Sequence, residues 1–423
     1  MEKYEKVAVD MPDMPMVPGS IAARKAVLKH EVEEATIYVR YSDWMRVQHL
    51  EAKADATDYR VFLNGIAASL LSKQVGSNKI VSPLSIFHAL AVAATLTEGN
   101  TQREILSAMG VSDAAHASSA IRSQYKANLA HGGAEVRPSS MLWLDDSVVA
   151  DQSMLKQLSD AALTGVCQGR MTDSCFKAAI SSWLDEATGR KLSQASRTLD
   201  IDDKTKLIVL TTLYFHDKWG REFDRMKTAT AMFHALNGDL SARFMRQAAL
   251  LEIWIEDDFT AVPLRFLSGS ELWLILPREG LAPEEVLRPG FFSLFPPEWK
   301  QRQKRDVHMW IPKFDLSQDD DILNSLKALG IHSLFSDDSR TPFLQVEGRG
   351  IKVDQVRHSA RITVDERGCE ASAYTAMMGI VAAGIPKKPP RFDFRLDRPF
   401  LFILTGKGNL PLFTGIVHRP MEA

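Results

Sequence analysis

The chain has 423 residues, of which 45% are hydrophobic and 25% are charged, and its formal net charge is −2. These values exclude a wholly disordered, collagen-like or coiled-coil chain. The balanced charge gives no general attraction to nucleic acid or to an anionic membrane, and no run approaches the ~20 apolar residues of a membrane helix. At roughly 150 residues per domain, the length alone predicts two or three domains.

The sequence contains three cysteines, Cys167, Cys175 and Cys369. This small, odd number excludes a disulfide scaffold, and reduced thiols are a simpler interpretation than a Cys167–Cys175 disulfide. The start of the chain has no apolar segment typical of a secretory signal, and no asparagine lies in an N-glycosylation sequence. We therefore favour a cytoplasmic location, while an extracellular one stays open.

Residues 1–54 differ in pattern from the rest of the chain. Prolines interrupt the first residues, and Ile21–His30 and Val39–Ala54 have the spacing of short amphipathic helices. We interpret residues 1–54 as an N-terminal extension, partly helical or flexible, that precedes a main domain over residues 55–423.

A strand followed by a buried helix is predicted soon after the extension. Ile80 and Val81 are typical of a short strand, Ser82 is a suitable helix N-cap, and Pro83 fits the first helical turn. The stretch Ile86–Leu96 is almost entirely apolar, so the helix should be central and buried.

Strands and helices then follow one another without regular alternation, which favours the α+β class. A helix is predicted over Ile322–Leu329, with Gly330 at its C-cap. Strand-like runs occur at Leu207–Phe215, Leu272–Leu276, Val307–Ile311, Ala360–Val364 and Phe400–Leu404. No internal repeat and no long linker divides the chain, so it should hold fewer domains than its length suggests.

The segment after Val364 has an unusual composition. No charged residue occurs between Glu370 and Lys387, and small residues dominate. Read with a period of two, one face is small and uncharged throughout, and it carries Cys369, Ala371, Ala373, Thr375, Met377 and Gly379. The segment is therefore compatible with an exposed loop and with a central strand, although an ordinary alanine-rich loop has the same composition.

A series of motifs, in this order along the chain, resembles the serpin family. The motifs are Asn78–Ile86, Thr97–Thr101, Leu213–Trp219 with Phe223, Ile311–Phe314, His358–Ala360, Asp365–Ala371, Arg398–Phe402 and Phe413–Val417. The resemblance extends from Asp58 to Pro420. It implies one α+β domain with the serpin fold, which has three β-sheets, eight to nine helices and an exposed reactive-centre loop, here at about residues 368–392.

The resemblance also implies a mechanism. A serine protease, or a cysteine protease, attacks the loop as a suicide substrate and forms an acyl-enzyme, and the cleaved loop then inserts into the main sheet as a new strand and distorts the protease. The implied partner is therefore a protease held in a covalent complex. The protein itself would be a monomer that is not an enzyme and needs neither a cofactor nor a metal.

Residue roles follow from the motifs. The hinge of the loop would comprise Glu366, Gly368, Cys369, Glu370, Ala371, Ser372, Ala373 and Thr375. Lys313 is expected to pair with Glu366, Trp219 would mark the region called the breach, and the polar cluster called the shutter would comprise Asn78, Ser82, Ser85 and His358.

Two positions depart from the family pattern. Cys369 stands where Thr or Ser is usual in inhibitory members, and Thr211 stands where Asn is usual. A thiol is small enough for insertion, and its oxidation would block insertion, which makes Cys369 a candidate redox switch.

The bond attacked by the protease can be placed in two ways. Counting sixteen residues on from Glu366 gives the bond between Ala382 and Ala383, which suits elastase-like or subtilisin-like proteases. The loop is longer than usual, however, and counting back from Phe400 reaches Lys388, so trypsin-like specificity through Lys387 or Lys388 stays open. We prefer Ala382, because the length from the hinge limits insertion.

Two other function classes remain. A non-inhibitory serpin would act as a carrier or chaperone, and an unrelated hydrolase would need a catalytic signature, yet no G-x-S-x-G, H-E-x-x-H or P-loop motif occurs. The basic residues Lys300, Arg302, Lys304 and Arg305 form a run that could bind a polyanion, although a solvated loop is the interpretation we favour.

Overall fold

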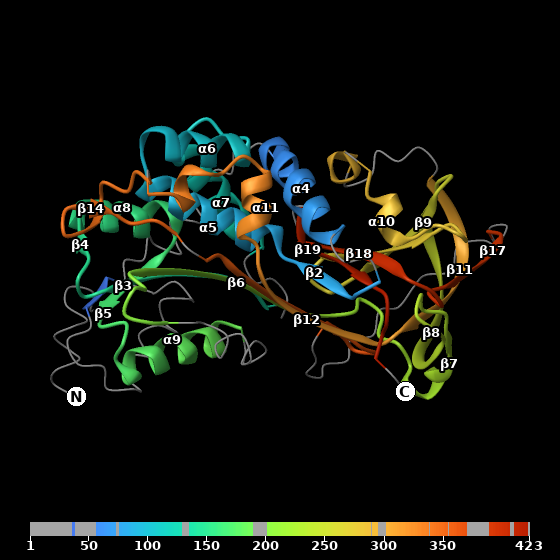
Figure 1. Cartoon of the computed structure of the whole chain (residues 1–423). Helices are drawn as coiled ribbons and strands as arrows, with labels where there is room; N and C mark the ends of the chain where they lie inside the picture. Colours follow the sequence, from blue (N-terminus) through green and yellow to red (C-terminus); the bar gives the residue numbers. More distant parts are fainter. Residues whose placement is uncertain are drawn as a thin grey trace.

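A computed structural model gives the structure of the protein (Figure 1). It describes residues 36–38, 56–72, 76–128, 135–188, 201–288, 290–294, 302–337, 339–353, 355–369, 389–406 and 410–421. Within these residues three sheets are packed with helices, which confirms the α+β class and the three sheets expected from the sequence.

The first large sheet has seven strands and carries the loop hinge. In spatial order they are β1 (Thr36–Tyr38), β5 (Gly165–Gly169), β3 (Glu135–Asp145), β6 (Leu207–Lys218), β16 (Gly368–Cys369), β15 (Arg357–Val364) and β12 (Phe314–Asp321). Strands β3 and β6 run antiparallel, as do β12 and β15. The two antiparallel pairs are joined only through the two-residue strand β16 in the described part of the chain.

The second large sheet has nine strands. In order they are β17 (Arg391–Arg395), β11 (Arg302–Pro312), β8 (Leu240–Ile255), β9 (Phe259–Arg265), β10 (Glu271–Pro277), β18 (Phe400–Thr405), β19 (Pro411–Val417) and β2 (Lys79–Val81), with β7 (Ala229–Phe233) paired to β8. A small third sheet contains β14 (Arg349–Gly350), β13 (Leu344–Val346) and β4 (Val149–Ala150). All five strand-like runs predicted from the sequence lie in observed strands.

Helices lie on both faces of the seven-stranded sheet and also against the nine-stranded sheet. They are α4 (Ala56–Leu71), α5 (Pro83–Leu96), α6 (Gly99–Met109), α7 (Ala114–Asn128), α8 (Gln152–Ala162), α9 (Ser174–Ala187), α10 (Pro283–Val286) and α11 (Leu323–Ala328), with 3-10 turns η2 (Arg225–Lys227), η3 (Phe291–Leu294) and η4 (Ser333–Phe335). Figure 1 shows α9 on one side of this sheet and the group from α5 to α8 on the other.

Strand β3 is buried on both faces because of these two helical layers. Trp143 packs edge-on against Phe176 and Trp183 of α9, with ring centroids 5.6 and 6.3 Å away. Leu142 and Leu144 point to the opposite face and belong to the core with α5 and α8. Two-sided burial explains why this strand carries apolar residues at successive positions rather than in alternation.

The start of α5 confirms the prediction from Ser82 and Pro83. The Ser82 hydroxyl accepts a hydrogen bond from the Ser85 amide, and Pro83 occupies the first turn. The end of α11 differs by one residue from the prediction, because the C-cap is Leu329 and Gly330 follows it at a φ of 91°.

The strand β1 was not expected from the sequence. It lies within the N-terminal extension and pairs antiparallel with β5, with Ile37 opposite Cys167. Three residues with no clear flanking turn signal are too short for a periodicity to detect. The helices predicted over Ile21–His30 and Val39–Ala54 lie outside the described residues.

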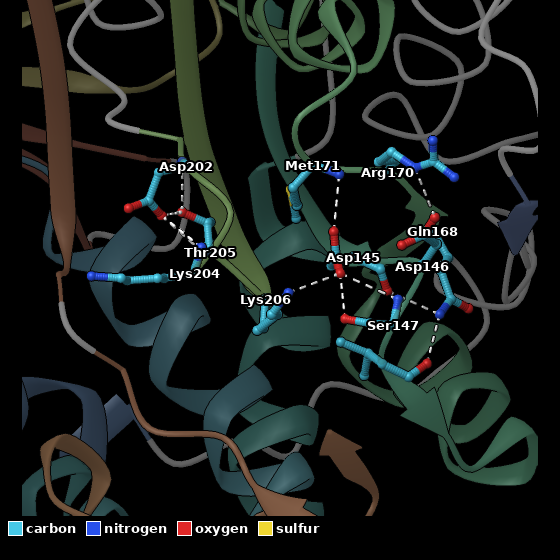
Figure 2. Close-up of polar contacts among 11 residues, drawn as sticks. Asp145, Asp146, Ser147, Gln168, Arg170, Met171, Asp202, Lys204, Thr205 and Lys206 are labelled. Carbon is cyan, nitrogen blue, oxygen red and sulfur yellow. Dashed lines mark hydrogen bonds and ion pairs between the residues drawn. The ribbon is translucent and has the colours of Figure 1, made fainter. Parts of the chain in front are cut away.

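The carboxylate of Asp145, at the end of β3, joins three segments (Figure 2). It accepts hydrogen bonds from the amides of Met171 and Ser147, at 3.0 and 3.2 Å, and lies 3.2 Å from the Lys206 ammonium. Burial alone would raise the pKa of Asp145, but these donors outweigh it and lower the pKa. The contacts fix the start of β6 relative to β3 and to the segment that leads into α9.

Replacing Asp145 should therefore lower the stability of the protein. Asp145→Ala leaves the Met171 amide and the Lys206 ammonium without their carboxylate partner, so we expect the free energy of unfolding to fall by about 3 kcal/mol. Chemical denaturation measures this loss. Asp146→Ala is the matched control, because Asp146 is half-exposed and its ion pair within the described residues is with exposed Arg170. If both substitutions lowered the free energy of unfolding equally, Asp145 would not have the structural role assigned to it.

Candidate functional site

The hinge residues Gly368 and Cys369 form a strand between β6 and β15. Cys369 lies opposite Asp217 on β6 and opposite Val364 on β15, and both pairings are antiparallel. Gly368 lies opposite Lys218. The residues that enter the loop are thus already paired within the sheet on both sides.

Gly368 is required by its close approach to β6. A β-carbon at this position would lie 2.2 Å from the Asp217 carbonyl oxygen and 2.7 Å from the Lys218 α-carbon, both of which belong to the backbone. Its φ of 152° is also rarely adopted by residues with a side chain. The sequence predicted a glycine for freedom of the backbone, and the structure adds a steric reason.

The segment that follows β6 holds the residues before the hinge. The Trp219 amide donates to the Arg367 carbonyl at 3.0 Å, and the Trp219 indole nitrogen donates to the Asp365 carbonyl at 2.8 Å. The Phe223 amide donates to the Glu366 carbonyl at 2.8 Å. Trp219 is itself fixed by stacking on Phe266, with ring centroids 4.4 Å apart. Trp219, which the resemblance assigned to the breach, therefore lies against the residues that precede the hinge.

The side chain of Glu366 forms the predicted ion pair. Its carboxylate lies 2.8 Å from the Lys313 ammonium and accepts a hydrogen bond from the Thr228 hydroxyl at 2.9 Å. Burial would raise the pKa of Glu366, but Lys313 and Thr228 outweigh it, and the pKa is lowered. Because Lys313 directly precedes β12, this ion pair attaches the hinge to the start of that strand.

The thiol of Cys369 is buried and unreactive in this arrangement. Only 3% of the residue is exposed, and the Sγ atom donates to the Thr363 carbonyl at 3.2 Å. Burial, together with the nearby carboxylates of Asp365 and Asp217, raises the pKa of the thiol well above its usual range. Because the thiolate is the form that oxidants attack, this environment opposes the redox switch considered from the sequence.

A second polar cluster lies where α5 begins beneath the sheet. The Ser82 amide donates to the His358 Nε2 atom at 3.1 Å, and the hydroxyls of Ser82 and Ser85 are 3.0 Å apart. The Thr211 hydroxyl donates to the Ser85 carbonyl at 2.8 Å, so this departure from the family pattern still joins β6 to α5. Burial lowers the pKa of His358 to about 4, so the ring is neutral at pH 7.

Asn78 does not belong to this cluster, which corrects the prediction. Its amide nitrogen donates to the Arg419 carbonyl at 2.6 Å, and its amide oxygen accepts from the backbone amides of His418 and Arg419. Asn78 therefore fastens the start of β2 to the end of β19. The side chain that the sequence missed is Gln318 on β12, whose amide oxygen accepts from the Ile80 amide at 2.8 Å.

Below Cys369, β6 and β15 do not pair with each other in the described part of the chain. A cavity of about 30 Å³ directly beneath Cys369 is lined by Leu213 and Phe215 from β6 and by Ile362 from β15. A second cavity of about 440 Å³ continues along Leu207–Thr211 of β6 and reaches His358. Together they mark a slot between β6 and β15, which run parallel because each is antiparallel to β16, and residues of α5 also line the larger cavity.

The rest of the predicted site lies outside the described residues. This holds for the hinge residues beyond Cys369 and for both candidate bait bonds, namely Glu370, Ala371, Ser372, Ala373, Thr375, Ala382, Ala383, Lys387 and Lys388. All three cysteines are free, as expected. Among the described residues there is no group of three potential metal ligands, and no helix is long and apolar enough to cross a membrane.

Comparison with known proteins places the chain in a family. A family model described as "Serpin (serine protease inhibitor)" matches residues 62–420. Serpin-ZX of Arabidopsis thaliana is 29% identical over 367 residues, which cover 82% of this chain and 93% of that protein. A serine protease inhibitor of Cyanea capillata is 27% identical, with 84% and 95% covered.

Solved structures agree with the sequence comparisons. Arabidopsis AtSerpin1 in its native stressed conformation matches with a TM-score of 0.72 and 26% identity, covering 86% of this chain and 98% of that one. The thermophilic serpin tengpin in its native state gives a TM-score of 0.76 at 20% identity, covering 88% and 96%. The protein belongs to the serpin family, whose members are typically protease inhibitors rather than enzymes.

The close approach of Gly368 gives a direct test. In Gly368→Ala the added methyl group collides with the β6 backbone, so we expect a loss of at least about 3 kcal/mol of stability or local release of the hinge. Gly280→Ala is the control, because Gly280 also has a positive φ but no atom within 4 Å of its β-carbon position, which leaves about 1 kcal/mol of backbone strain. Denaturation and hydrogen exchange of the Cys369 amide measure both effects. If both substitutions lowered the free energy of unfolding equally, the positive φ of Gly368 would explain the need for glycine, and its close approach to β6 would not.

The buried imidazole of His358 predicts a pH dependence. Because its pKa falls to about 4, the unfolded chain binds a proton between pH 6.5 and 4 that the native state does not. Stability should therefore fall as the pH drops through this window, by about 3 kcal/mol from this group. His358→Gln keeps an acceptor for Ser82 without titrating, so its stability should depend less steeply on pH. His116→Gln, at a partly exposed position on α7, is the control. If the pH dependence of stability in His358→Gln were as steep as in the unmodified protein, His358 would not be its source.

Proposed function

We propose that the protein inhibits serine proteases as a suicide substrate, by inserting its cleaved reactive-centre loop into the slot between β6 and β15. The observation that carries the proposal is the position of Cys369, which lies in a short strand at the top of this slot, while below it β6 and β15 do not pair with each other among the described residues. Family membership supports the same function.

The register of Cys369 fixes where each inserted residue would lie. Continuing both antiparallel ladders places Ala371 between Phe215 and Ile362, and Ala373 between Leu213 and Ala360. These four partners are buried, as Asp217 and Val364 are beside Cys369. The small, uncharged face of the loop would thus enter the core, and the opposite face, with Glu370 and Tyr374, would point away from it.

The energetics favour insertion. Ladder hydrogen bonds contribute about 1 kcal/mol each, so a strand of about ten residues gains on the order of 10 kcal/mol before burial is counted. Glu366, Trp219 and Gly368 hold the top of the strand in register, so insertion can proceed from an end that is already paired. Loop cleavage supplies the free end that the rest of the strand needs.

The length of the slot agrees with the preferred bait bond. The extended register brings residue 379 opposite Leu207, where β6 begins, and Ala382 three residues further on. A protease acylated at Ala382 would therefore be carried to the end of the sheet furthest from the hinge. Small residues on both sides of this bond favour elastase-like or subtilisin-like targets, and Lys387 or Lys388 would serve trypsin-like ones.

The decisive assay is formation of a covalent complex. Incubation with pancreatic elastase, subtilisin and trypsin should give a complex that resists SDS with at least one of the first two, since the protease is trapped as the acyl-enzyme. Mass spectrometry of the released C-terminal peptide should place cleavage after Ala382. Simple cleavage of the loop by all three enzymes, without a complex, would instead support a non-inhibitory serpin.

Two loop variants separate insertion from recognition. Ala373→Arg would place a charge between Leu213 and Ala360, where an unpaired charge costs several kcal/mol, so the variant should be cleaved as a substrate without forming a complex. Tyr374→Arg is the matched control, because this position faces away from the core and already carries a bulky side chain. Inhibition that survives in Ala373→Arg, or is lost equally in both variants, would contradict insertion in this register.

A further inference from the structure

A cavity of about 1170 Å³ lies outside the insertion slot. It is bounded by β8 and β11 on one side and by the Trp219–Phe223 segment and the β9–β10 turn on the other. Its volume is slightly above the range of about 300–1000 Å³ that is typical of sites for small organic ligands. No residue of the proposed insertion mechanism needs this volume.

The walls of this cavity combine aromatic rings with an excess of positive charge. Trp254 and Trp273 lie 4.9 Å apart, and the stacked rings of Trp219 and Phe266 also line the cavity, although each of the four residues is at most 8% exposed. At the rim, the side chains of Leu250 and Leu267 are 55% and 48% exposed. These surfaces suit a flat apolar body, because aromatic rings stack with little loss of conformational freedom.

Four basic and two acidic side chains line the same cavity. The basic ones are Arg221, Arg265, Arg302 and Lys304, and the acidic ones are Glu252 and Glu271. Arg302 pairs with Glu252, and Arg265 pairs with Glu271 at 2.8 Å. The Arg221 guanidinium donates to the Ala248 carbonyl, and Lys304 lies opposite Glu252 in the β11–β8 ladder. Among the described residues, neither the Arg221 nor the Lys304 side chain forms an ion pair.

We propose that this cavity binds an amphiphilic aromatic anion, a molecule with a flat apolar ring system and one sulfonate or carboxylate group. The rings would pack between Trp254 and the Trp219–Phe266 pair, and the anionic group would lie near Arg221 and Lys304. Because Trp219 also donates to the Asp365 carbonyl, the bound molecule would brace the segment that holds the hinge. Binding by itself does not depend on protease inhibition.

The test uses two probes that differ only in the charged group. The probe 8-anilinonaphthalene-1-sulfonate carries a sulfonate, and N-phenyl-1-naphthylamine has the same rings without it. The sulfonate should bind one to one, with energy transfer from the cavity tryptophans, and should bind at least tenfold more tightly than the neutral probe, a difference of about 1.4 kcal/mol. It should also raise the midpoint of thermal unfolding.

Variants of the cavity locate the binding. Lys304→Glu reverses a rim charge and should weaken binding of the sulfonate by roughly tenfold while leaving the neutral probe unaffected. Ala249→Trp fills the cavity and should abolish binding of both probes. Lys156→Glu, on exposed α8 far from the cavity walls, is the matched control and should change neither. Binding that is unaltered in Lys304→Glu, or equal affinity for the two probes, would overturn the proposal.

Discussion

Backbone hydrogen bonding at the centre of the seven-stranded sheet is the constraint on which the rest of the structure depends. Strands β6 and β15 share a partner only at Gly368 and Cys369, and below these residues they do not pair in the described part of the chain. Two strand edges that face each other across a slot gain stability from any strand that fills it. Under the proposed insertion, the same unpaired edges would account for a loop whose composition suits a strand.

The contacts around the slot determine when it can be filled. Above it, the Glu366–Lys313 pair and the Trp219 hydrogen bonds keep the hinge attached to the sheet. Below it, His358, Ser82 and Thr211 join the two strands to α5 through polar contacts. Hydrogen bonds of this kind hold a defined geometry but exchange partners at modest cost, whereas interlocked apolar side chains would resist opening.

Much of this arrangement could be predicted from the sequence because it depends on local or characteristic patterns. Ser82 and Pro83 predict the start of α5, and the resemblance to serpins assigned Glu366 and Gly368 to the hinge and Trp219 to the breach. What sequence reasoning missed depends on contacts between distant segments. Asn78 bonds to the chain more than three hundred residues later, and neither periodicity nor local motif reports such a partner. The strand β1 was missed for a different reason, because a strand of three residues is too short to show an alternation of apolar and polar side chains.

Hydrogen exchange of the slot edges, before and after loop cleavage, tests the central claim most directly. The peptides to follow are residues 207–216 of β6 and 357–363 of β15, in which alternate amides face the slot while the others pair with β3 and β12. If the cleaved loop inserts between these strands, exchange in both peptides should slow markedly after cleavage, while β10 in the other sheet stays unchanged. Exchange in both peptides that is unaffected by complete cleavage would contradict insertion and, with it, the account given for this fold.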